Sequence, residues 1–542
     1  MRSSHAITGG LIWAVVLAVA WTGIAAAQEA APAPAPATPV APAAAPGEPD
    51  EKLKDLWTNF LHYILLARPE AAMSYGKAIL DANPDPRQVY YLSVRSDKSG
   101  VTLATGRGMT QLTPIVEKIS ALIVQGARDV RKDTDEIERW IKMLEGTPRQ
   151  FLMGTERLVN SAEYAVPQLI AAMENPRTSA SLRERITTIL PRLGKDAVRP
   201  LSESLQSKDP YVREVVARTL GKIGYGHAAP YLKEMAERKG MLARIAHVAN
   251  GALASCAGRK ALSKPVAELF YDLADKYYSR AESLGPDSRY ETSNVWYWQE
   301  GLGLTYKIVP RVIFNEVYAM RAAQAALVHD AKFDPAIPLW IAANIRKESN
   351  LLVENARRTA ANLPAAKDPT HPDDEPAAAY YALAGSAKYL QAVLARALKE
   401  NDLAVATGAI SALKRTAGTK NLVAVLDDQG GAQPLVAAMG SPSRLVRYMA
   451  AEIIAARPAK RFTGWHLVVP VLIESLRQSG TPIAVLADPV LDRRNEIKDL
   501  IRTAGGEVVD ADNFGKALQA ARDGAGADVA FIATDVTGPG FR

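Results

Sequence analysis

Cysteine is almost absent from this sequence: Cys256 is the only one in 542 residues. A single thiol can form neither an intrachain disulfide nor a CxxC motif, so burial of apolar side chains must hold the fold together. The sequence also contains no P-loop and no G-x-S-x-G nucleophile motif. We therefore predict no catalytic residue, no metal site and no cofactor.

Charge is nearly balanced along the chain. The 65 basic and 58 acidic residues give a formal charge of +7, and they are interleaved without a long basic run. A nucleic-acid-binding surface needs a concentrated basic patch or stripe. We therefore expect no nucleic-acid partner.

A long apolar run lies near the N-terminus, over residues 11–27, and follows Arg2. Its small-residue end, Ala25-Ala26-Ala27, is typical of a cleavage site, so residues 1–27 are predicted to be a signal peptide. An uncleaved membrane anchor is the alternative, since about 17 residues are close to the shortest span. Residues 28–50 are rich in Ala and Pro and are predicted to form an extended linker. We expect an exported protein, periplasmic or extracellular, without stable membrane insertion after cleavage.

A pair of helical patterns recurs with a period of about 31 residues, which is typical of a solenoid. The first pattern begins at Ala165, Ala197 and Ala228, and the second at Leu182, Val212 and Ala243. Within each pattern the apolar positions follow helical spacing. Between the two patterns, Asp209 suits a helix cap and Pro210 suits a first helical turn.

Residues 200–224 resemble the short HEAT repeat, the variant also called PBS-lyase-like. The resemblance is carried by Asp209, Pro210, Val212, Arg213, Ala217, Leu220, Ile223 and Gly224. A distant copy, residues 434–454, aligns on residues 200–220 without a gap. The resemblance implies a solenoid whose stacked helices offer a long face for binding another protein.

The predicted fold is mainly α-helical: an α-α superhelix of HEAT-like and tetratricopeptide-like pairs, with an inserted β-hairpin and a small C-terminal α/β module. Alternation around Gly301 and Gly303 indicates the hairpin. The predicted ranges are 1–27 for the signal peptide, 28–50 for the linker, 51–146 for N-terminal tetratricopeptide-like helices, 147–262 for HEAT repeats, 263–376 for helices with the hairpin at 295–309, 377–480 for further HEAT repeats, and 481–542 for the α/β module.

The C-terminal segment, residues 481–542, alternates strand and helix patterns, which predicts parallel βαβ units. The order resembles the receiver domain of response regulators. Asp488 matches the second metal-binding acid of that family, whereas the first falls on Ala487 and the phosphoacceptor on Ala533. Asp535 lies near the acceptor position but matches it only after a shift. The resemblance implies a partial, inactive module, whose unpaired edge strand needs either further chain or a partner.

The string HPDDE, residues 371–375, resembles the zinc motif of PIG-L/LmbE-type deacetylases. It follows a loop-like segment rather than a strand, and His466 is the only later histidine. Zinc needs three or four converging ligands. We therefore interpret the string as an acidic surface loop.

Three aromatic residues, Trp296, Trp298 and Tyr306, could stack on a sugar or a peptide. Trp296 and Trp298 also fall on one face of a strand, where burial against helices is the alternative. The isolated His227 and His247, and Cys256 in an Ala-rich helix, are interpreted as structural.

Together these features favour a non-catalytic, exported solenoid scaffold that binds another protein. One alternative is a signalling protein in which the receiver-like module, through Asp488 and Asp535, regulates binding by the solenoid. Another is an enzyme similar to bilin lyases, which the repeat type alone suggests, although fold does not imply function. The sequence leaves open the partner, its binding face and the oligomeric state.

Overall fold

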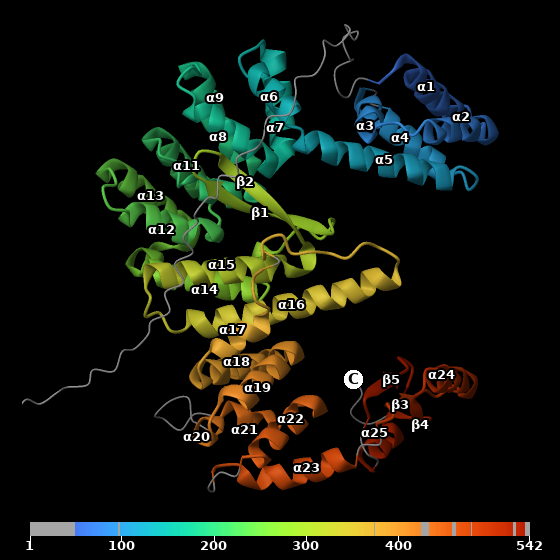
Figure 1. Ribbon diagram of the computed structural model, residues 1–542. Coiled ribbons are helices and arrows are strands. Elements are labelled where there is room, and N and C mark those ends of the chain that lie inside the picture. The colour runs from blue at the N-terminus through green and yellow to red at the C-terminus, as the bar shows by residue number, and fades with distance from the viewer. Residues whose placement is uncertain are drawn as a thin grey trace, which may run out of the picture. The chain divides into compact units, whose positions relative to one another are not determined.

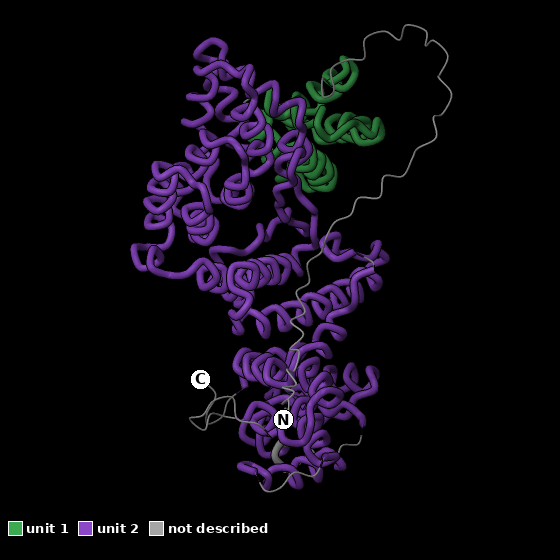
Figure 2. Tube along the Cα trace, turned by 60° about the vertical axis from the view of Figure 1, so that its left-hand side comes forward, with its two compact units in different colours: residues 1–127 green, residues 128–542 purple. Residues whose placement is uncertain are grey.

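The computed structural model describes residues 49–95, 98–372, 374–423, 433–457, 462–477, 480–523 and 527–536. The predicted signal peptide and all but the last two residues of the predicted linker lie outside these ranges. The chain divides into two compact units, residues 1–127 and 128–542, which Figure 2 distinguishes by colour. None of the helices in the described ranges has both the length and the apolar character needed to span a bilayer.

The first unit is a small helical body. It opens with a pair of helices that meet at Pro69, α1 (Glu51–Leu65) and α2 (Pro69–Asp81). The Asp50 side chain caps α1 by accepting from the amide of Leu53 at 2.6 Å. The remaining helices are α3 (Pro86–Arg95), α4 (Ser99–Arg107) and most of α5 (Thr113–Lys132). The apolar faces of these helices form one core that includes Trp57, Phe60 and Ile79.

The second unit begins with α6 (Thr134–Met143) and α7 (Pro148–Ser161), followed by a stack of helix pairs (Figure 1). The pairs are α8 (Val166–Glu174) with α9 (Ala180–Ile189), α10 (Val198–Ser204) with α11 (Pro210–Ile223), and α12 (Ala229–Glu237) with α13 (Ala243–Ala257). Equivalent helices of successive pairs pack on one another, as α11 does on α13. This is the predicted solenoid arrangement.

The repeat signature acts through local geometry at both ends of α11. Asp209 accepts a hydrogen bond from the amide of Tyr211 at 2.8 Å, and Pro210 is the first helical residue. Gly224 ends the helix with φ of +69°, a conformation that favours glycine because it has no Cβ. The distant copy shares the start position but not these end signals: α22 (Arg444–Ala455) begins at the position that the ungapped alignment pairs with Pro210, and Ser443 before it makes no side-chain cap.

The middle of the second unit holds the predicted β-hairpin. Its strands, β1 (Thr292–Gln299) and β2 (Gly303–Pro310), pair antiparallel with Trp296 opposite Tyr306. The hairpin therefore begins three residues before the predicted boundary, at Thr292 rather than Val295. It contacts α8, α10 and α15 of the stack (Figure 1). The surrounding helices are α14 (Val266–Tyr278), α15 (Phe314–His329) and the long α16 (Ala336–Ala360).

Shorter helices continue the stack after a loop. They are α17 (Ala378–Ala384), α18 (Ala387–Glu400), α19 (Leu403–Thr416), α20 (Thr419–Leu422), α21 (Pro434–Ala438), α22 and α23 (Val468–Leu476). One continuous apolar core extends from Val266 to Val471 and joins these helices to α14, α15 and α16. Burial thus replaces the disulfides that the sequence cannot form.

The C-terminal segment forms the predicted parallel sheet. Its strands are β3 (Ile483–Ala487), β4 (Glu507–Ala511) and β5 (Val529–Ile532), in the order β4-β3-β5. Helices α24 (Leu491–Thr503) and α25 (Phe514–Asp523) connect the strands. Among the described strands β5 pairs with β3 alone and lies at one edge of the sheet.

Candidate functional site

The hairpin is fastened to the helical stack by buried polar groups. Trp296 on β1 is fully buried, and its indole N–H donates to the Glu163 carboxylate at 2.7 Å. Asn294 on the same strand donates to the other oxygen of Glu163 at 2.8 Å. Burial raises the pKa of Glu163, and the two hydrogen bonds together with the charge of Arg199 oppose that rise.

A second attachment comes from Arg321 on α15. Its guanidinium donates to the backbone carbonyl of Trp296 at 2.7 Å and to the Glu203 carboxylate on α10 at 3.0 Å. The same guanidinium lies 4.1 Å from the centre of the Tyr297 ring, a cation–π contact. Burial raises the pKa of Glu203, and Arg321 opposes that rise. One arginine therefore ties together α10, α15 and β1.

The third part of the network surrounds His227. Arg199 donates to the Tyr277 hydroxyl at 3.2 Å, and that hydroxyl lies 2.9 Å from His227 Nδ1. While it accepts from Arg199, the hydroxyl still has a proton that it can donate to Nδ1 of a neutral His227. Burial, reinforced by the charges of Arg199 and Arg321, holds the pKa of His227 well below its usual value.

We call Glu163, Arg199, Glu203 and Arg321 the hairpin clamp. Two carboxylates and two guanidiniums balance each other, and each is held by hydrogen bonds inside the protein. Buried charges are stable only when they are paired and hydrogen-bonded in this way. The clamp therefore fits a structural role, which is to fix the hairpin on the stack, better than the exchange of protons with a substrate.

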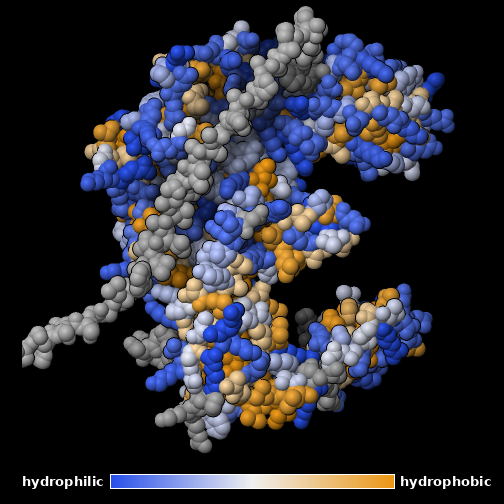
Figure 3. Space-filling view, in the orientation of Figure 1, coloured by the Kyte–Doolittle hydropathy of each residue, from blue (hydrophilic) through white to orange (hydrophobic). Residues whose placement is uncertain are grey.

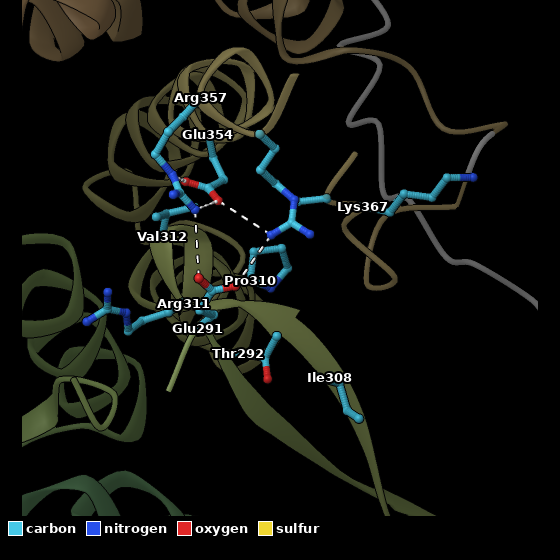
Figure 4. Close-up of a pocket in the computed structure, with 11 residues that line it drawn as sticks. Glu291, Thr292, Ile308, Pro310, Arg311, Val312, Glu354, Arg357 and Lys367 are labelled. Atoms are coloured by element: carbon cyan, nitrogen blue, oxygen red, sulfur yellow. Dashed lines mark hydrogen bonds and ion pairs between the residues drawn. The ribbon is translucent and has the colours of Figure 1, made fainter. Parts of the chain in front are cut away.

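An open hollow of about 340 Å³ lies at the base of the hairpin. Its walls are the two ends of the hairpin, the last turns of α16 and the segment that follows this helix. Arg357 of α16 lies between Glu354 and Glu291 there, whereas Arg311 and Lys367 point away from them (Figure 4). The hollow is open to solvent, so a ligand could enter it.

The three predicted ligand-contact aromatics occupy different environments. Trp296 is bonded to Glu163 of the clamp and is fully buried, so its ring is used for packing. Trp298 is half-buried, and Tyr306 is exposed although its ring lies 4.8 Å from that of Trp296. Tyr306 also meets Tyr164 edge-on at 5.9 Å. The three side chains therefore do not present one flat platform of the kind that a sugar would need.

The HPDDE string lies in the loop after α16, as expected. His371 Nδ1 is 2.8 Å from Glu375, while Asp373 lies outside the described residues. His466 is exposed before α23. In the described part of the chain, no three His, Cys, Asp or Glu residues come together as a metal would require. A buried ion pair between Lys347 and Asp368, at 3.0 Å, fastens the loop to α16 instead.

The other singled-out residues are far from this region in the sequence. His247 is exposed on α13, and the half-buried Cys256 donates to the carbonyl of Leu220 at 3.4 Å. Burial raises the pKa of the Cys256 thiol to about 11. The thiol is therefore protonated near neutral pH and is not a ready nucleophile.

The structure brings Asp488 and Asp535 to one cation, Arg493. Its guanidinium lies 2.5 Å from one Asp488 oxygen and 2.7 Å from an Asp535 oxygen. Hydrogen bonds from Arg493 lower the pKa of Asp488. A protein side chain thus neutralises the two carboxylates that the receiver resemblance picked out.

Sequence reasoning missed the clamp. Glu163, Arg199, Glu203 and Arg321 lie in helical patterns where charged residues normally face solvent. The one available signal was indirect: the aromatic and polar side chains of β1 needed partners for their N–H groups once the strand was placed against helices.

Comparisons with known proteins agree with this architecture. Residues 166–249, which form α8 to the first half of α13, match the family model of HEAT repeats. The chain is a mainly α-helical repeat protein that contains a segment similar to HEAT repeats. The predicted hairpin and the predicted parallel sheet complete its fold.

Two further matches are partial or weak. D-3-phosphoglycerate dehydrogenase from Dictyostelium discoideum is 31% identical over 130 residues, which is 23% of this chain and 32% of that enzyme. The chain thus spans about a third of the length of this curated relative. A solved structure described as a circular tandem repeat protein with novel repeat topology and enhanced subunit contact surfaces is 11% identical, covering 84% of this chain and 96% of that one. Its TM-score of 0.16 is too low to indicate a shared fold.

Proposed function

We propose that this chain is a non-catalytic scaffold that binds another protein through its helical stack. The observation that carries the proposal is an apolar stripe on α23, made of Val469, Ile473 and Leu476. These side chains recur at helical spacing and are 60%, 43% and 85% exposed. Figure 3 shows apolar side chains gathered over this helix.

Exposed apolar stripes have a physical cost that a partner relieves. Helical repeats bury their apolar faces against the next repeat, and the end of a stack usually carries a polar outer face. The face of α23 is apolar instead, which favours a further helix packing against it. The proposed occupant is a helix of a partner protein, laid along Val469 and Ile473.

The interior supports a non-catalytic role. Arg321 pairs with Glu203, and Glu163 and Arg199 are hydrogen-bonded to other groups inside the protein. HEAT repeats commonly serve as protein-binding scaffolds. The partial similarity to a dehydrogenase covers too little of either chain to carry that activity over.

Site-specific cross-linking tests the scaffold. A photoreactive amino acid placed at Ile473 in the full chain should trap a discrete partner in the producing cell, whereas the same group at Arg415, exposed on α19, should not. Ile473→Glu should abolish capture from a neighbouring position such as Val469. Equal trapping at positions 473 and 415 would contradict the proposal.

Export is the second part of the proposal and is supported by the N-terminal sequence. The apolar run over residues 11–27, its Ala-rich end and the Ala/Pro-rich linker favour cleavage and release from the membrane. Measuring the intact mass and the compartment of the protein from its own cell tests whether the signal peptide is cleaved and the protein exported. A periplasmic or secreted species that begins at Gln28 is expected, and a full-length cytoplasmic species would overturn it.

For the C-terminal segment we propose an inactive, receiver-like docking module. Arg493 lies between Asp488 and Asp535 and opposes the binding of a divalent cation there. A signalling function would need one of these carboxylates to accept a phosphoryl group. Incubation of the full chain with acetyl phosphate and Mg²⁺ should therefore add no phosphate to its mass, and phosphorylation at either position would favour the signalling alternative.

A further inference from the structure

The hollow at the base of the hairpin has two chemically different walls. Ile308, Pro310 and Val312 supply apolar surface, and Arg357 and Arg358 supply two guanidiniums from the end of α16. A volume of about 340 Å³ is enough for one or two side chains and lies at the lower end of ligand pockets. Such a combination suits a ligand with an anionic head and an apolar body.

Both guanidiniums are already oriented by the protein. Glu354 accepts from Arg357 Nε at 2.9 Å and from its Nη2 at 2.7 Å (Figure 4). Arg358 donates from Nε to the carbonyl of Pro364 at 2.6 Å. A guanidinium that is fixed in this way loses little freedom when it binds a carboxylate or a phosphate.

The Glu291 side chain faces these two arginines but forms no close hydrogen bond with either of them. Its carboxylate lies 3.5 Å from Arg358 Nη1 and 3.9 Å from Arg357 Nη2, beyond the usual range of a hydrogen bond. The side chain is 70% exposed, although its backbone carbonyl is fixed by the amide of Arg311 at 2.8 Å. An exposed pair of this kind is weak and easily replaced.

We propose that the hollow binds the carboxylate of an acidic peptide segment, which takes the place of Glu291 beside Arg357 and Arg358. The apolar part of the same segment would rest on Ile308 and Val312. In the free protein the Glu291 carboxylate competes with the ligand for the two arginines and so weakens binding. A ligand carboxylate that comes closer to the arginines displaces it. This inference rests on the proposed scaffold function in one respect, which is that the carboxylate belongs to a partner protein.

Ligand-observed NMR on the full chain tests the site with a small probe, acetyl-leucyl-glutamate. The probe, amidated at its C-terminus so that the glutamate side chain is its only carboxylate, should bind, and its neutral counterpart acetyl-leucyl-glutamine amide should not. Arg358→Gln should weaken binding by about tenfold, as expected for loss of a charge-assisted hydrogen bond. Glu291→Gln should strengthen it by about two- to fivefold, because it removes a competing exposed carboxylate.

The matched control is Arg289→Gln. Arg289 lies in the same segment as Glu291, pairs with Asp287 at 2.6 Å and is outside the hollow, so its loss should leave binding unchanged. Circular dichroism melting of each variant confirms that it is folded. Inorganic phosphate separates the possible sources of the anion: if phosphate binds and the dipeptide does not, the carboxylate assignment is overturned.

Two other results would overturn the inference: unchanged binding in Arg358→Gln, or weaker binding in Glu291→Gln. The outcome is independent of cross-linking on α23. Dipeptide binding without a trapped partner removes the scaffold proposal alone, and a trapped partner without dipeptide binding removes this site alone.

Discussion

Replacing Arg321 by methionine tests whether the buried ion network holds the hairpin. The substitution keeps most of the side-chain length but removes the donors to Glu203 at 3.0 Å and to the Trp296 carbonyl at 2.7 Å. It leaves Glu203 buried without its cation and leaves the carbonyl of β1 without this donor. It also removes the positive charge from the face of the Tyr297 ring.

The expected cost follows from these losses. Removing one partner of a buried ion pair destabilises a protein by about 3–5 kcal/mol. In a repeat protein each unit contacts mainly its neighbours, so the loss should be concentrated in the hairpin and α10. At about 1.4 kcal/mol per tenfold change, amide hydrogen exchange in β1 should accelerate by about a hundredfold to a few thousandfold. Hydrogen exchange with mass spectrometry of peptides that cover residues 292–299 measures this directly.

Two further variants serve as controls for Arg321→Met. Lys414→Met removes an exposed ion pair with Glu452 and should cost about 0–1 kcal/mol. The double variant Arg321→Met with Glu203→Leu leaves neither buried charge alone and should recover much of the lost protection. If Arg321→Met leaves exchange in β1 within about fivefold of the wild type, as a surface pair would, the clamp does not hold the hairpin.

Other consequences of the structure can be measured with single substitutions. Because the folded-state pKa of His227 lies well below its usual 6.5, the unfolded chain takes up a proton that the folded chain does not, so this histidine's contribution to stability is present above about pH 6.5 and is lost as the pH falls. His227→Phe should therefore reduce the fall in melting temperature between about pH 7 and pH 5, and an unchanged slope would contradict the assignment. Gly224→Ala, at φ of +69°, should lower the free energy of unfolding by about 1 kcal/mol. Gly251→Ala, which faces open space on α13, should raise it by about 0.5–1 kcal/mol, and chemical denaturation of each variant measures both changes. With a thiol pKa of about 11, Cys256 in the folded chain should react with iodoacetamide far more slowly at pH 8 than it does after denaturation, and equal rates would show that the thiol is not sheltered.

Much of the fold could be predicted from the sequence because its signals are local. Asp209, Pro210 and Gly224 specify where one repeat helix begins and ends, and apolar spacing selects the face that is buried. The copy at residues 434–454 repeats the apolar spacing of this unit, and the structure starts α22 at the expected position. Strand alternation likewise identified the hairpin and the parallel sheet, with a three-residue error at Thr292.

The candidate site depended on the tertiary structure. The bonds that join Arg321 to Glu203, and Glu163 to Asn294 and Trp296, connect residues 118, 131 and 133 positions apart. Local patterns cannot distinguish a buried charged residue on a helix from a solvated one, because the difference lies in which distant element covers it. The Arg357 and Arg358 wall is formed in the same way, where the end of α16 meets the base of the hairpin.

The sequence by itself thus determined that this protein is a stack of paired helices with an inserted hairpin and a short parallel sheet. Helix caps, turns and apolar periodicity act between residues that are close along the chain. They can therefore be recognised in the sequence without knowing how distant segments pack. Only the tertiary structure decided which charges are buried as the clamp and which remain open in the hollow. That distinction depends on desolvation, which a side chain experiences only after remote segments have packed around it.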